Sequence, residues 1–75
     1  MIGSSDDFPK VMELLDNQGE ISEARAVAEK GHFFAKRLVE YYDKIKRGDN
    51  SSMTKRYLVA AYQDYRKKCS AFLSQ

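Results

Sequence analysis

Apolar side chains recur every three or four positions in three stretches of the chain, a spacing that places them on one face of a helix. In the first stretch, four large apolar residues follow the spacing i, i+3, i+4 and i+7: Phe8, Val11, Met12 and Leu15. Asp7 is the predicted N-cap, and Pro9 falls in the first turn, where its missing N–H costs nothing. The pattern predicts a short helix over residues 8–17.

The second stretch carries a longer seam whose steps alternate between three and four residues: Ala24, Val27, Gly31, Phe34, Leu38, Tyr41 and Ile45. Ser22 is the predicted N-cap of this segment. So regular a seam is typical of a bundle helix and predicts one continuous helix over residues 23–47. Gly31 falls mid-helix, where glycine costs about 1 kcal/mol relative to alanine. We interpret it as a point where a neighbouring helix crosses closely.

The third stretch follows the loop "GDNSS" and predicts a helix over residues 53–73, with Ser51 or Ser52 as its N-cap. Its apolar face consists of seven residues: Leu58, Ala61, Tyr62, Tyr65, Cys69, Phe72 and Leu73. Because the connecting loop is short, the second and third helices are expected to form an antiparallel hairpin.

These segments predict an all-α fold, with a flexible N-terminus at residues 1–6 and a single three-helix domain at residues 7–75. At 1.5 Å per residue, the first helix is about 15 Å long and the second about 37 Å. The first helix therefore covers only one half of the long helical hairpin. The short turn after it predicts that this is the half remote from the hairpin loop, which leaves the loop end uncovered.

The uncovered end predicts a partner-binding face, because two helices alone cannot enclose its large side chains. The candidate residues are Leu38, Tyr41, Tyr42, Ile45, Tyr57 and Leu58. Tyrosine suits such a surface because its ring can pack while its hydroxyl meets water. We expect the partner to be another protein or a second copy of the chain. Phe33 lies off the main stripe and is either an isolated exposed residue or part of a second contact face.

The net charge of +2 conceals an asymmetry between the two halves of the chain. Residues 1–29 hold seven acidic and two basic residues, whereas residues 30–75 hold eleven basic and four acidic ones. Five cations meet at the hairpin end: Lys44, Lys46, Arg47, Lys55 and Arg56. This basic pole is either a solvated end or a site for an anion or acidic surface. Interleaved tyrosines and cations also allow nucleic-acid binding.

The sequence offers little basis for catalysis. There is one cysteine, Cys69, and one histidine, His32, so neither a disulfide nor a metal site is expected. We find no Ser/His/Asp set and no glycine-rich phosphate loop, and we expect no enzyme activity, cofactor or small-molecule substrate. The start resembles no signal peptide, and no apolar run reaches the ~20 residues that span a bilayer. An intracellular location, cytoplasmic or nuclear, is the expectation.

The segment "MELLDNQGEISEARAVAEK" runs from a helix through a glycine-containing turn into an alanine-rich helix. In this order, and in its outline of a helix followed by a longer hairpin, the chain resembles microtubule-interacting-and-trafficking domains. The first helix is shorter here, and the second longer, than in that family. The resemblance implies a three-helix, peptide-binding module. Three functions are thus expected: a helical interaction or assembly module, a nucleic-acid or anionic-surface binder, and a peptide-binding module.

Overall fold

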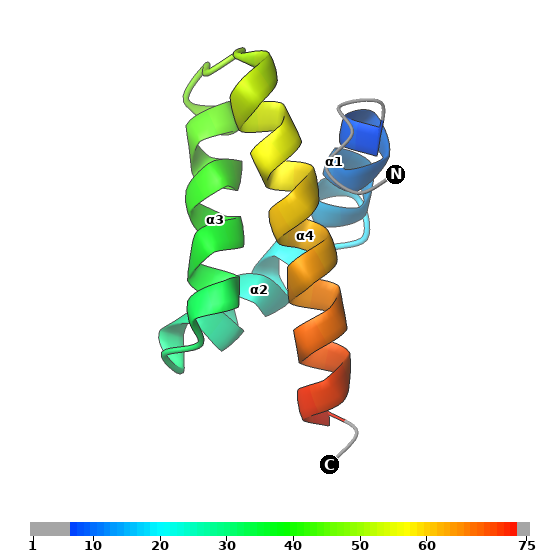
Figure 1. Cartoon of the computed structure of the whole chain (residues 1–75), viewed down its shortest axis with the longest axis vertical. Coiled ribbons are helices and arrows are strands. Elements are labelled where there is room, and N and C mark those ends of the chain that lie inside the picture. Colours follow the sequence, from blue (N-terminus) through cyan, green and yellow to red (C-terminus); the bar gives the residue numbers. More distant parts are fainter. Residues whose placement is uncertain (1–6, 74–75) are drawn as a thin grey trace.

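The computed structural model describes residues 7–73 of the chain, with side chains as far as Cys69. The described part is all-helical and contains four helices: α1 (Phe8–Asp16), α2 (Glu20–Glu29), α3 (Phe33–Lys46) and α4 (Ser52–Leu73) (Figure 1). The predicted flexible segment at residues 1–6 and the predicted core side chains of Phe72 and Leu73 lie outside this description. The all-α class is confirmed, but the predicted three-helix arrangement is replaced by four helices.

The ends of α1 and α4 fall close to the predicted ones. Pro9 lies in the first turn of α1 as expected, whereas Asp7 occupies the N-cap position without a side-chain capping bond. At α4 the predicted serine cap is confirmed, because Ser51 Oγ accepts a hydrogen bond of 3.1 Å from the backbone N–H of Thr54. The Asp49 carboxylate accepts bonds from the Ser51 N–H and the Thr54 hydroxyl, and these lower the pKa of Asp49. The hairpin loop is thus held by its own side chains.

The prediction of one continuous helix over residues 23–47 is wrong, because the chain turns between α2 and α3. Gly31 has a φ of +97°, in the left-handed region that glycine adopts at helix ends, and His32 then takes an extended conformation. The interpretation of Gly31 as a close crossing point is also wrong, since a Cβ there would meet nothing within 4 Å. At the start of α2, Gly19 occupies the N-cap position, which is three residues before the predicted cap at Ser22.

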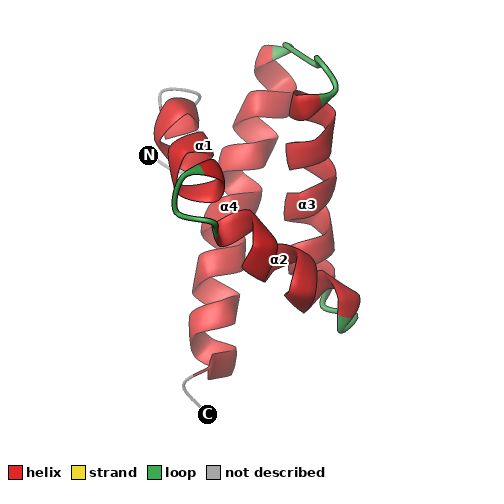
Figure 2. Cartoon of the chain, turned by 180° about the vertical axis from the view of Figure 1, so that it is seen from behind, coloured by secondary structure: helices red, strands yellow, loops and turns green. Residues whose placement is uncertain are grey.

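The turn at Gly31 changes which part of the hairpin α1 covers. Figures 1 and 2 show α2 running obliquely across one side of the α3–α4 pair, and α1 lying beside the half of α4 that is nearer the hairpin loop. Consistently, α2 packs on α3, and α1 packs on both α2 and α4. The Lys55 ammonium, early in α4, lies 5.2 Å from the centre of the Phe8 ring in α1. The loop end, predicted to be uncovered, is therefore the end that α1 covers.

The core draws on all four helices and contains twelve buried residues: Val11, Leu15, Ala24, Ala35, Leu38, Tyr42, Leu58, Val59, Ala61, Tyr62, Tyr65 and Cys69. Each of its three tyrosine hydroxyls donates a hydrogen bond to a carboxylate on α1 or α2. Tyr42 donates to Asp16, Tyr62 donates to Glu20 at 2.8 Å, and Tyr65 donates to Glu23 at 2.9 Å. Burial raises the pKa of all three hydroxyls. These bonds join the α3–α4 pair to the α1–α2 side.

Candidate functional site

Half of the predicted partner-binding face lies inside the protein. Leu38 and Leu58 are completely buried, and Tyr42 is only 7% exposed. These side chains belong to the chain's own core and are out of reach of a partner, because α1 and α2 close over the surface that was expected to be uncovered. Tyr41 and Ile45 are partly buried, and only Tyr57 is largely exposed.

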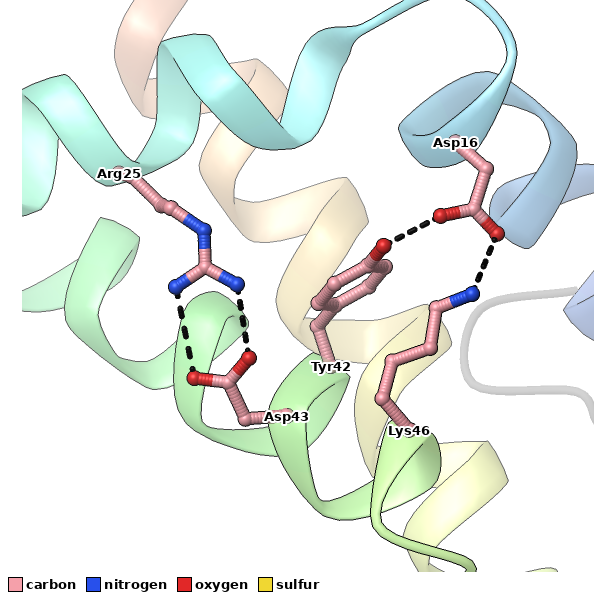
Figure 3. A network of polar contacts seen from close by, with 5 residues as sticks. All are labelled: Asp16, Arg25, Tyr42, Asp43 and Lys46. Carbon is pink, nitrogen blue, oxygen red and sulfur yellow. Dashed lines mark hydrogen bonds and ion pairs between the residues drawn. The ribbon is translucent and has the colours of Figure 1, made fainter.

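A polar network around Tyr42 explains why this end is closed (Figure 3). Asp16 at the end of α1 accepts a hydrogen bond from the Tyr42 hydroxyl and pairs with Lys46 at 3.1 Å. The Tyr42 bond lowers the pKa of Asp16, and Lys46 adds to the effect. Beside it, the Arg25 guanidinium of α2 pairs with Asp43 at 2.8 Å. The network therefore ties α1 and α2 to the same stretch of α3.

The basic pole is partly used within the chain. Lys46 pairs with Asp16, and Lys55 stands over the Phe8 ring. The other three cations are exposed near the hairpin loop: Lys44, Arg47 and Arg56. The structure thus brings the predicted cations to one end of the hairpin, where three of the five already have partners, because Lys44 also stands over a ring, that of Tyr41. Anion binding at this pole stays a prediction.

A groove runs along the α3–α4 pair and is lined, among the described side chains, by residues of these two helices and none from α1 or α2. It consists of two hollows of about 260 and 230 Å³ that share Arg37 and Asp64 in their walls. We call it the α3–α4 groove. Its residues are Phe33, Phe34, Arg37, Tyr41, Tyr57, Ala60, Ala61, Asp64 and Lys68.

The groove combines a low floor with aromatic walls. Ala60 and Ala61 form a stretch of small side chains on α4. The rings of Tyr41 and Tyr57 lie beside it with their centres 5.7 Å apart. Phe33, at the other end of the groove, is 69% exposed. Three large apolar side chains stand out as exposed in the described part of the chain: Phe33, Met53 and Tyr57. Two of them line this groove.

Cations stand on these aromatic walls. The Arg37 guanidinium lies 5.7 Å from the centre of the Phe33 ring, and the Lys44 ammonium lies 5.8 Å from the centre of the Tyr41 ring. Among the described side chains, neither cation forms an ion pair. Asp64 contributes a carboxylate to the groove, and Lys68 pairs with it at 3.4 Å. The groove is thus apolar at its floor and predominantly basic at its edges.

The sequence predicts only part of the groove. Tyr41 and Tyr57 belong to the predicted partner face, and Phe33 lies off the main stripe. The missed residues are Phe34 as a wall residue, Arg37, Ala60, Ala61, Asp64 and Lys68. A signal for the α4 wall does exist, because four residues share a second stripe at the spacing i, i+4, i+7 and i+11: Met53, Tyr57, Ala60 and Asp64.

A larger hollow, of about 380 Å³, lies between α1 and α4. Its apolar walls include Val11, which is buried, and Leu14, which packs against the core. Its lining also includes the charged side chains of Asp7, Lys10 and Arg66. Within residues 7–73 we find no cluster of three metal-ligating side chains, and no helix there has the length and apolar character needed to cross a membrane.

Comparison of the chain with models of protein families, with curated proteins and with solved structures finds no match in any of the three. The case for a function therefore depends on the geometry. That geometry is an all-helical chain in which α1 and α2 pack on the α3–α4 pair and a groove is lined by described residues of α3 and α4.

Proposed function

We propose that the chain is a non-catalytic protein-interaction module whose α3–α4 groove receives a segment of another protein. The observation that supports this proposal most is the exposure of Phe33 and Tyr57, 69% and 48%, along a groove between two helices. Burial of a large apolar side chain is worth roughly 1.5–3 kcal/mol. Leaving both in water forfeits a large share of that gain in so small a chain, and a partner that covers the groove recovers it.

The shape of the groove suits a helix. From Phe33 to Tyr41 it follows α3 for about 12 Å, which corresponds to two turns of a partner helix. Small side chains at Ala60 and Ala61 allow a helix to approach closely, while the aromatic residues on either side can grip its apolar stripe. Such helix-in-groove binding is a common mode of peptide recognition, and it agrees with the peptide-binding function that the family resemblance implies.

The charge of the groove favours a different protein over a second copy. In a two-fold contact the same patch faces itself. Arg37 and Lys44 of one copy would then approach the same predominantly basic edges of the other, and like charges across an interface are costly. Self-association through this groove is therefore disfavoured.

Selection of helical peptides from a displayed library tests the proposal. Binding of the selected peptides should be lost when the groove is filled and charged by Tyr57→Lys together with Ala60→Glu. A matched control, Gln18→Lys together with Ala26→Glu, makes the same change of charge at exposed positions outside the groove and should bind as the wild type does.

Unfolding curves must show that both double variants fold. If no peptide is selected, or if the selected peptides bind the groove variant as tightly as the wild type, the groove is not an interaction site. Sedimentation of the free chain adds a check, since the proposal expects a monomer.

A further inference from the structure

We infer that the α3–α4 groove selects an acidic amphipathic helix, one whose apolar stripe is flanked by carboxylates. This inference rests on the proposed function and adds the chemistry of the partner. It follows from the two cations that stand on the aromatic wall of α3. Arg37 and Lys44 each lie over a ring, and neither forms an ion pair within the described part of the chain.

The spacing of these cations defines a register for the partner. Arg37 and Lys44 are seven residues apart, which is two turns and about 10 Å along α3. The ring beneath each cation limits where its charge can lie, because a cation is attracted to the face of an aromatic ring. A partner helix that lies along α3 would meet both charges with carboxylates at positions i and i+7.

The far wall of the groove is also positively charged. Arg56 and Lys67 are exposed on α4, and their spacing from Ala60 places them along the outer side of the groove. Three acids lie near these cations: Asp64 pairs with Lys68 at 3.4 Å, Asp49 interacts electrostatically with Lys44, and Glu40 is exposed on α3 between Arg37 and Lys44. A partner helix in the groove would thus have cations on both sides.

The same cations would attract nucleic acid, but the middle of the groove argues against it. The floor at Ala60 and Ala61 offers no ring on which a base could stack. The Tyr41 and Tyr57 rings beside it contact each other, and Lys44 and Arg37 lie over the Tyr41 and Phe33 rings, so the ring faces that single-strand sites depend on for stacking are already in use. A helix with apolar residues over the alanines and carboxylates over the cations fits both features.

Two synthetic peptides of about three turns test the inference. They share one leucine stripe, and one carries glutamates at i, i+7 and the flanking positions where the other carries lysines. Measured by fluorescence anisotropy, the glutamate peptide should bind about tenfold more tightly than the lysine peptide, and its affinity should fall as salt is added. The double variant Arg37→Glu with Lys44→Glu should reverse this preference.

Lys30→Glu with Arg47→Glu is the matched control, because it changes the net charge equally at exposed positions outside the groove and should keep the preference for glutamate. Equal affinity for the two peptides, or binding of neither, overturns the inference. Library peptides that bind in the groove without acidic residues would overturn it while leaving the proposed function intact. A single-stranded oligonucleotide that binds more tightly than the glutamate peptide, and is lost in the Arg37/Lys44 variant, would overturn both.

Discussion

Replacement of Gly31 by alanine probes the turn that separates α2 from α3. An L-residue at a φ of +97° costs about 1–2 kcal/mol. The added Cβ meets no atom within 4 Å, so the cost comes from backbone strain alone. Part of it is offset because alanine restricts the unfolded chain, by about 0.4–1 kcal/mol. The expected net loss is about 1 kcal/mol. In an unbroken helix the same substitution would instead stabilise the chain by about 1 kcal/mol.

The assay is thermal unfolding followed by circular dichroism. A loss of 1 kcal/mol corresponds to a fall in melting temperature of about 4–8 °C in a domain of this size. A chemically synthesised chain with D-alanine at position 31 is the matched control, because it adds the same methyl group but favours positive φ, and it should melt at or above the wild-type temperature. A higher melting temperature with L-alanine would refute the turn and with it the placement of α1.

Three further predictions concern stability. Asp16→Asn should cost about 0.5–1 kcal/mol at neutral pH. Because the folded-state pKa of Asp16 is lowered, the contribution is present above its ordinary value of 3.8 and disappears as the pH falls below it, so the melting temperatures should converge in acid. Burial raises the folded-state pKa of the Tyr65 hydroxyl above its ordinary value of 10.0, so the neutral hydroxyl favours the folded state and this contribution is lost as the pH rises above that value. Tyr65→Phe should therefore flatten the fall in melting temperature at alkaline pH. Ser51→Ala should lower the free energy of unfolding by about 1 kcal/mol in urea titrations, and an unchanged midpoint would contradict the cap.

The sequence predicts the helical class of the fold because apolar spacing, Pro9 and the serine cap all act locally. The turn at Gly31 is different, because a glycine in the middle of a seam can mark either a close contact or a helix end. The spacing of three and four residues continues across the turn and hides it. In α3 the buried residues are Ala35, Leu38 and Tyr42, so the core face is rotated by about one position from the predicted Phe34–Leu38–Tyr41 seam. Tertiary packing decides this rotation.

The burial of Tyr42 was missed for the same reason. A straight second helix carries α1 away from the hairpin loop, whereas the observed turn brings it toward the loop and closes over Tyr42. The stripe of Met53, Tyr57, Ala60 and Asp64 is visible in the sequence. Which stripe of a helix stays exposed depends on where the neighbouring helices cross it, and that is a long-range property which spacing along one helix does not contain.

The most direct test of the account is a map of amide chemical shifts in the isotope-labelled chain as the glutamate peptide is added. We predict that the largest changes cluster at Phe33, Arg37, Tyr41, Tyr57 and Asp64, along the α3–α4 groove. Amides on α2, none of whose described residues lines the groove, should change little. Changes centred instead on the hollow between α1 and α4, or on the hairpin loop, would contradict the claim that the groove is where this chain binds its partner.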